Sequence, residues 1–537
     1  MKVYGVKGAS ILQRIIRVGV LCLAIATLVL SPALSSVGVV LCEDSVDDSG
    51  NDKPLREGRK AIRAGEFEKA LKLYREMLDK NGTDVQARLG AAFAYSKLGD
   101  YVHCFDEAAE VLKLNARNAR AHALAGISLL RSGFVRLAVI QLEQAINLDP
   151  KEALAWGGAA EVDYYEGRLK ESRVKALYAH NLDPSEPDYI ITYARSSSRV
   201  EDFKEAAEAY ELYLEVAPKT DTERRDRIRG LVSFYRQLAG LRVHQISGPL
   251  KSEVPFLLGS DRRPYVRLKV NGRDTNFVID TGSGFTVLSK DAAKRLGVSE
   301  LARGGKSQGL GGDGKFPIVY GLIKSLQLGD VKIKMVPCFV RPFHGATDRS
   351  PEERADGFIG LSILSHFLTQ LDYKENRIRL ERDDNKPSQV AVIPGVTVVP
   401  FRTTQNGLIS IETQFDDYNM INAILDSGAS SSVISLAAVE RLKMHDRIIK
   451  GQTASVIGAA GITENVQMLF IRNCKVADVQ QNNLRALVLD FGAINETSGF
   501  EQSGILGGDF LRHFRVTIDF NRAQLSFQPH AIPDKPE

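Results

Sequence analysis

The sequence has little cysteine and no excess of charge of either sign. Five cysteines in 537 residues are too few for a disulfide framework. The 70 basic and 66 acidic residues leave a net charge of +4, which gives no reason to expect nucleic acid as a partner. The length and the 44% hydrophobic content leave room for about two to four domains, each with a sizeable core.

Acidic residues are absent from the N-terminus, where no Asp or Glu precedes Glu43. Basic residues there are followed by an apolar run, Val18 to Leu30, and then by small residues that include Ala33-Leu34-Ser35. This is the pattern of a secretory signal. The alternative is an uncleaved membrane anchor within residues 1–41, because Val18 to Leu41 is long enough to span a bilayer. In both cases we expect a periplasmic or secreted protein that meets a membrane only through this segment.

Residues 42–54 are acidic and polar and are predicted to be a linker, after which a period of 34 residues begins. Small residues recur at this spacing where two helices must touch, and prolines recur at the ends of the units. Two series of residues recur every 34 positions. The first is Gly65, Gly99, Gly133 and Gly167, with Glu201 at the fifth place, and the second is Ala70, Cys104, Ala138, Ser172 and Ala206. This pattern resembles the tetratricopeptide repeat. We expect five repeats and a capping helix within residues 55–241.

The resemblance implies that the array presents a concave groove to peptides or to a partner protein. Tyr164, Tyr165, Tyr189 and Tyr193 are candidates to line this groove. The alternative is a stalk or spacer that holds the rest of the chain away from a membrane.

From about Val254 the helical spacing gives way to short apolar or alternating runs separated by Asn-Gly and Gly-Asp. Such runs predict antiparallel strands joined by hairpins. This half of the chain is duplicated, because Val278-Ile279-Asp280-Thr281-Gly282 returns as Ile424-Leu425-Asp426-Ser427-Gly428. Gly357-Phe358-Ile359-Gly360 likewise returns as Gly504-Ile505-Leu506-Gly507. We predict two lobes of one design, residues 242–385 and 386–537.

Asp280 and Asp426 each end an apolar strand, where an unpaired carboxylate would be costly to bury. The cost falls if the two acids lie side by side and share one proton. The duplicated pattern resembles the pepsin/retropepsin superfamily of aspartic peptidases, with short lobes closer to the retroviral type. The resemblance implies an all-α tetratricopeptide solenoid followed by an all-β bilobal aspartic-protease fold. It also implies an endopeptidase in which the two acids activate a water, with no metal, cofactor or covalent intermediate.

The resemblance assigns a role to the residues around each acid. Thr281 and Ser427 would cross-link the two loops, and Gly282 and Gly428 would let backbone amides approach the carboxylates. Apart from the resemblance, we hypothesise that Ser283 hydrogen-bonds Asp280 and that Ala429 at the equivalent place cannot help Asp426, so that the charge rests preferentially on Asp280. A flap over the substrate is expected from Gly309, Leu310, Gly311, Gly312, Asp313 and Gly314, with Ile457 and Gly458 in the second lobe.

Two rival interpretations of the whole chain stay open. The lobes could bind peptides without cutting them, with the repeat array as a scaffold. The chain could also process itself near Ser247 to Pro255 and release the protease half. His366 and His513 occupy equivalent places, one in each lobe, so we expect a structural role for each and no metal site.

Overall fold

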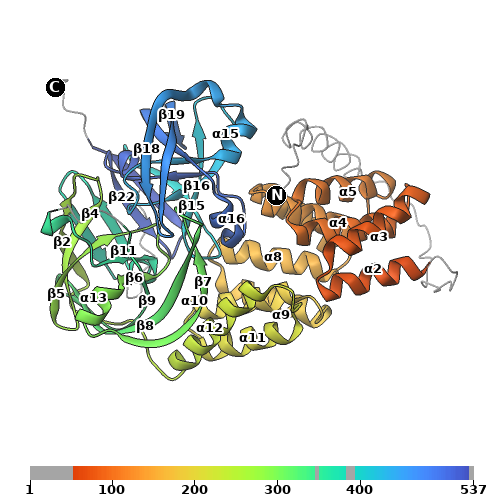
Figure 1. Ribbon diagram of the computed structural model, residues 1–537, viewed down its shortest axis with the longest axis horizontal. Coiled ribbons are helices and arrows are strands. Elements are labelled where there is room, and N and C mark those ends of the chain that lie inside the picture. Colours follow the sequence, from red (N-terminus) through yellow and green to blue (C-terminus); the bar gives the residue numbers. More distant parts are fainter. Residues whose placement is uncertain (1–51, 345–349, 383–393, 531–537) are drawn as a thin grey trace. The chain divides into compact units, whose positions relative to one another are not determined.

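The computed structural model describes residues 52–344, 350–382 and 394–530. Figure 1 shows helices in the first part of the chain and strands in the second. Within the described residues, five consecutive helix pairs are followed by one longer helix, as predicted. The pairs are α2 (Asp52–Ala64) and α3 (Phe67–Lys80), α4 (Val85–Leu98) and α5 (Tyr101–Leu114), α6 (Ala119–Arg131) and α7 (Val135–Leu148), α8 (Ala153–Tyr165) and α9 (Leu169–Leu182), and α10 (Pro187–Arg199) and α11 (Phe203–Val216), and the longer helix is α12 (Thr222–Leu238).

The turn between the two helices of each pair explains why glycine recurs every 34 residues. Gly65, Gly99, Gly133 and Gly167 have φ angles of 77°, 76°, 84° and 77°, in the left-handed region that glycine adopts without steric cost. Glu201 at the fifth place keeps the same backbone, with φ of 62°. Several of the helices begin at a side chain that accepts a backbone N–H bond in the first turn, from Asp84, Asp100, Asn118, Asp202 and Asp221. The helical repeat fold is therefore confirmed.

The predicted signal or anchor, residues 1–41, lies outside the described residues, as does most of the predicted linker. Export therefore stays a prediction. Within the described ranges, no helix combines the length and the apolar character needed to cross a bilayer.

The β-rich part of the chain forms one large sheet in each lobe. The sheet of lobe 1 has the order β1-β9-β6-β10-β5-β4-β8-β7, with β3 paired to β4. Its strands are β1 (Gln245–Ser247), β3 (Leu257–Leu258), β4 (Pro264–Val270), β5 (Arg273–Ile279), β6 (Thr286–Ser289), β7 (Ser299–Gln308), β8 (Lys315–Leu328), β9 (Val331–Arg341) and β10 (Gly357–Ile359). The short helices of this lobe are α13 (Lys290–Arg295), η1 (Pro351–Glu353) and α14 (Leu361–Leu364).

Lobe 2 repeats this design in the order β14-β15-β16-β21-β17-β20-β19-β18. Its strands are β14 (Arg402–Thr403), β15 (Ile409–Phe415), β16 (Ile421–Leu425), β17 (Val433–Ser435), β18 (Ile448–Ile457), β19 (Ile462–Val476), β20 (Val479–Leu489) and β21 (Gly504–Leu506). Its short helices are α15 (Leu436–Leu442), η2 (His445–Arg447), α16 (Gly492–Ser498) and α17 (Gly508–Leu511). In both lobes the strand that precedes the acid pairs in parallel with the duplicated apolar-apolar-glycine strand, β5 with β10 and β16 with β21.

A third sheet joins the two lobes, which the sequence did not predict. Its order is β13-β23-β22-β11-β12-β2, from β2 (Lys251–Pro255), β11 (Leu368–Asp372), β12 (Arg377–Glu381), β13 (Thr397–Pro400), β22 (Phe514–Asp519) and β23 (Gln524–Pro529). The duplicated strands β11 and β22 pair with each other, Leu371 opposite Val516. The predicted boundary at 385/386 lies outside the described residues, so the domain boundaries stay predictions.

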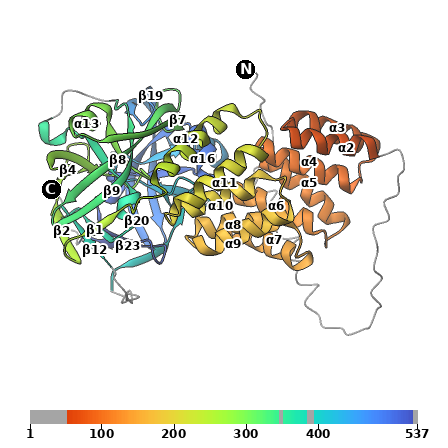
Figure 2. The ribbon, with the colours of Figure 1, turned by 90° about the horizontal axis from the view of Figure 1, so that it is seen from below.

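The structure divides into two compact units, and the division does not follow the change from helix to strand. The second unit contains residues 160–177, 186–217 and everything from Asp221 onward, so α10, α11 and α12 belong to the same unit as the lobes. Figure 2 shows α12 beside the strands of lobe 1. Gly230 on α12 lies against Gly304 on β7 so closely that a Cβ on Gly230 would be 2.5 Å from the Gly304 Cα. Phe234, fully buried, stacks on Tyr320 of β8 with ring centroids 4.7 Å apart.

The tyrosines expected to line a binding groove are mostly buried within this unit, so that expectation is corrected. Tyr164 donates a hydrogen bond from its hydroxyl to the Gln405 carbonyl in lobe 2, at 2.9 Å. The ring of Tyr165 packs on Phe500, with centroids 5.0 Å apart. Tyr164, Tyr165 and Tyr189 are each less than 5% exposed. The last repeats therefore use these aromatic side chains for internal packing, which a local sequence pattern does not reveal.

Candidate active site

Two parallel strand pairs hold the two predicted acids. Asp280 follows β5, where Phe277, Val278 and Ile279 are fully buried, and its N–H donates to the Ile359 carbonyl of β10 at 2.9 Å. Asp426 follows β16 in the same way, and its N–H donates to the Leu506 carbonyl of β21 at 3.0 Å. A strand that is apolar on both faces is buried on both faces and is therefore held firmly in the core. Because each acid directly follows such a strand, the strand fixes the position of the acid.

The hydroxyl residues after the acids cross-link the two loops, as the resemblance implied. The Thr281 hydroxyl donates to the Leu425 carbonyl at 2.7 Å and accepts the Ser427 N–H at 2.9 Å. The Ser427 hydroxyl in turn donates to the Ile279 carbonyl at 2.8 Å and accepts the Thr281 N–H at 3.1 Å. Both residues are fully buried. Since every donor and acceptor in this group has a partner, the loops from separate lobes are held at a fixed spacing.

The position after each hydroxyl residue requires glycine, because each loop runs directly beside the acid of the other lobe. A Cβ on Gly282 would lie 2.3 Å from the Asp426 carboxyl carbon, and a Cβ on Gly428 would lie 2.3 Å from Asp280 Oδ1. No real Cβ fits at such distances. The amide of each glycine also donates to the acid of its own loop, Gly282 to Asp280 Oδ1 at 2.9 Å and Gly428 to Asp426 Oδ1 at 2.8 Å.

The two carboxyl groups hydrogen-bond each other and differ in their surroundings. Burial raises the pKa of Asp426 well above its ordinary value, and the negative charge and hydrogen bond of Asp280 raise it further, against the opposing Gly428 and Ala429 amides. Asp280 receives an additional hydrogen bond from the Ser283 hydroxyl, which donates to Oδ2 at 2.6 Å. Ala429 has no hydroxyl, but its backbone amide donates to Asp426 Oδ1 at 3.0 Å, so the expectation that Ala429 cannot help Asp426 is corrected. The two acids therefore differ: the raised pKa of Asp426 favours its protonated form, and the Ser283 hydroxyl donates to Asp280.

The two predicted flap segments are hairpin tips, and they meet each other. The first tip joins β7 to β8 and is closed by Gly309 N–H to Gly314 O at 2.9 Å. The second joins β18 to β19 and is closed by Gly458 N–H to Gly461 O at 2.8 Å. The Ala460 amide of the second tip donates to the Leu310 carbonyl of the first at 2.9 Å. The backbones of the two tips are therefore in direct contact.

Tight backbone approach explains the glycines of the first tip. Gly311 and Gly312 have φ angles of 89° and 55°, and a Cβ on Gly311 would lie 2.2 Å from the Gly461 carbonyl oxygen. The side chains of Asp313 and Ile457 do not make this contact between the tips; Asp313 accepts the Lys315 amide at 3.0 Å, and the Ile457 side chain is exposed.

Arg341 is a residue of this site that the sequence analysis missed. It ends β9, and its guanidinium lies over the rings of Phe316, Phe343 and Phe358 at 5.3, 4.9 and 5.7 Å. It also donates to the Ala459 carbonyl in the tip of lobe 2, at 3.1 Å. Burial lowers the pKa of Arg341 to about 10, against the opposing effect of the Asp280 charge, so the side chain is cationic at neutral pH. A single arginine at a strand end carries no sequence signal that could have found it.

Within the described residues, the one group of three or more metal-ligating side chains is not at the two acids. Residues 266–363 and 411–510 both match the family model described as aspartyl protease. Both lobes match the aspartyl protease family. Each match contains one acid loop and one supporting strand, so the family pattern covers the duplicated geometry.

Solved structures similar to parts of the chain are of two kinds. The aspartic proteinase from Irpex lacteus is 13% identical, covers 52% of this chain and 98% of its own, and has a TM-score of 0.34. A thermophilic TPR protein of Thermus thermophilus is 22% identical, covers 33% of this chain and 97% of its own, and has a TM-score of 0.29. YrrB, described as a TPR protein with an unusual peptide-binding site, is 20% identical over 31% of this chain and 86% of its own, with a TM-score of 0.21.

Proposed function

We propose that the chain is an aspartic endopeptidase whose catalytic residues are Asp280 and Asp426. The observation that carries this proposal is the contact between the two carboxyl groups, which come from separate lobes and hydrogen-bond each other. Two carboxylates this close cannot both ionise, so they hold one proton between them near neutral pH. That state contains one base and one acid, which is what hydrolysis of a peptide by a water molecule needs.

The reaction proceeds in two balanced steps. The water oxygen attacks the peptide carbonyl carbon while the Asp280 carboxylate takes a proton from that water. At the same time Asp426 gives its proton to the carbonyl oxygen. A neutral tetrahedral gem-diol results, with Asp280 now protonated and Asp426 ionised. In the second step the C–N bond breaks, Asp280 protonates the leaving nitrogen, and Asp426 takes back a proton from a hydroxyl. The products are a carboxylic acid and an amine, and the pair returns to its first state.

The surroundings of the pair support this assignment of roles. The Ser283 hydroxyl donates to Asp280, and the cationic Arg341 favours a negative charge on it. Asp426 has a raised pKa and so retains the proton that an acid must donate. The flap tips, which meet through Leu310 and Ala460, would cover a bound peptide and exclude bulk water.

We propose further that the helical array recruits the protein substrate or a partner. The support is the confirmed repeat fold, since such arrays have extended concave surfaces. Because the tyrosines of the last repeats are buried in internal packing, the binding surface would belong to the first three repeats, α2 to α7.

The proposal is tested by incubating the full chain with a peptide library across acidic to neutral pH and mapping the cuts. Asp280→Asn and Asp426→Asn keep the shape of each side chain and remove its acid–base chemistry. Asp274→Asn is the matched control, because Asp274 lies on the same strand β5, is exposed and pairs with Lys269 at 3.2 Å. We expect cuts by wild type and Asp274→Asn alone. Binding of peptides without cuts by any of the four proteins would instead support a silent scaffold.

A further inference from the structure

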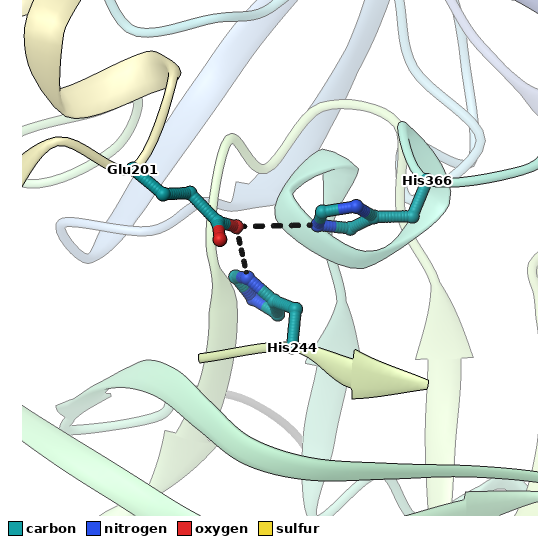
Figure 3. Close-up of side chains that lie close together, drawn as sticks. All are labelled: Glu201, His244 and His366. Atoms are coloured by element: carbon teal, nitrogen blue, oxygen red, sulfur yellow. Dashed lines mark hydrogen bonds and ion pairs between the residues drawn. The ribbon is translucent and has the colours of Figure 1, made fainter. Parts of the chain in front are cut away.

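A cluster of metal-ligating side chains lies away from the two acids. Glu201, His244 and His366 each place a ligand atom within 4.8 Å of the others, as Figure 3 shows. Glu201 comes from the turn between α10 and α11, His244 from the segment between α12 and β1, and His366 from the loop after α14. Three elements distant in sequence therefore converge at one point.

The geometry of the cluster centres on one carboxylate oxygen. Glu201 Oε1 lies 2.6 Å from His244 Nδ1 and 3.5 Å from His366 Nε2. The two imidazole rings have centroids 4.7 Å apart and are tilted by 45° to each other. In a tetrahedral zinc site with bonds of about 2.0–2.1 Å, neighbouring ligand atoms are roughly 3.4 Å apart. The Glu201–His366 pair is at that spacing already, and the Glu201–His244 pair needs to open by less than about 1 Å. The three ligand atoms all lie within 4.8 Å of one another, so side-chain rotation would have to bring the two histidine nitrogens to the ion as well.

The presence of glutamate at position 201 is a second observation that indicates a role for this cluster. The other four repeats place glycine at this turn, and the backbone of Glu201 keeps their left-handed conformation. A side chain in this conformation is strained relative to glycine. His244 also has a left-handed backbone, with φ of 44°. Strained backbone at two of three converging residues indicates that the position of these side chains matters to the protein.

Solvent can reach the cluster. The side chains of Glu201, His244 and His366 are 35%, 7% and 32% exposed, which leaves room for a solvent ligand.

His244 has the additional feature that its second ring nitrogen, Nε2, is buried and has no hydrogen-bond partner within the described residues. Nδ1 is the nitrogen that faces the carboxylate, 2.6 Å from Glu201 Oε1. Neutral imidazole is a ligand for zinc through either nitrogen.

We propose that Glu201, His244 and His366 bind one zinc ion, with solvent as the fourth ligand. Two histidines and one carboxylate around a tetrahedral ion are a donor set that zinc accepts. The ion would tie the last repeat to lobe 1 at the loop that follows β10 and α14, the elements beneath Asp280. The zinc ion would have a structural role, and zinc binding is independent of the proposed proteolysis.

Calorimetric titration of the chelator-treated full chain with zinc chloride tests this proposal. We expect one ion per chain in the wild type, with affinity lower by at least about tenfold in Glu201→Gly, His244→Ala and His366→Ala. Glu201→Gly is the most informative variant, because it restores the glycine of the other repeats and relieves backbone strain, so loss of binding there is not loss of fold. His445→Ala is the matched control, since His445 pairs with Glu440 at 3.0 Å but is not part of the cluster.

A second readout needs no activity. Zinc should raise the Tm of the wild type and of His445→Ala and leave the Tm of Glu201→Gly unchanged. Cobalt in place of zinc should give the visible absorption of a four-coordinate site in the wild type and lose it in His366→Ala. Unchanged zinc affinity in the three cluster variants, or no binding by the wild type, would overturn the proposal.

Discussion

Gly282 of lobe 1 lies so close to Asp426 of lobe 2 that a methyl group on Gly282 would be 2.3 Å from the carboxyl carbon. Gly282→Ala should therefore displace the acid and reduce kcat/KM about 100-fold or more, because a misplacement of about 1 Å can cost that much. Gly240→Ala is the control, since a Cβ at Gly240 would meet no atom within 4 Å. Equal activity of the two variants would show that the loops are not packed this closely.

Loss of the Ser283 hydroxyl should change the pH dependence. Its hydrogen bond to Asp280 Oδ2 stabilises the charged form of the pair, so Ser283→Ala makes the pair harder to ionise. We expect the acidic limb of the profile of kcat/KM against pH to move to higher pH. An acidic limb that stays in place would mean that the charge does not rest on Asp280.

Asp426 should make folding stability depend on pH. Because its pKa is raised above the ordinary value of 3.8, the folded protein holds this proton more tightly than the unfolded chain does. That contribution to stability is complete below the ordinary pKa and is lost as pH rises through the raised pKa. Asp426→Asn is neutral throughout, so its Tm should rise relative to wild type between acidic and neutral pH. A difference in Tm that is the same at every pH would contradict the raised pKa, and Asp274→Asn serves as the control.

The packing of α12 on lobe 1 should matter for the whole chain. Phe234 is fully buried against Tyr320, so Phe234→Ala should reduce the free energy of unfolding by about 3–5 kcal/mol. Chemical denaturation of the full chain measures this. Leu241→Ala, at a position 38% exposed, should change it by about 0.5 kcal/mol or less. If Phe234→Ala were equally mild, α12 would be only a cap on the helical array.

Local sequence patterns were enough to predict the repeats, the duplicated lobes and the loops at Asp280 and Asp426. Each depends on residues close together in the chain, such as a glycine turn or an apolar strand ending in an acid. The pairing of β11 with β22 and the contacts of Tyr164 and Phe234 with the lobes were not predictable in this way. They join segments far apart, and their residues look like ordinary strand or helix residues.

Arg341 and the histidine cluster were missed for a related reason. His366 was compared with its sequence equivalent His513, whereas in the structure it lies beside His244 and Glu201. One signal was available: Glu201 stands where four other repeats have glycine, which is a substitution that backbone energetics disfavours.

The central claim is that Asp280 and Asp426 work as one unit, and the loss of kcat/KM in the two single variants and the double variant tests it most directly. If the pair shares one proton, Asp280→Asn and Asp426→Asn should each remove nearly all activity, and Asp280→Asn/Asp426→Asn should be no worse than either. Losses that multiply in the double variant, or a single variant that still cuts peptides at close to the wild-type rate, would contradict the shared mechanism.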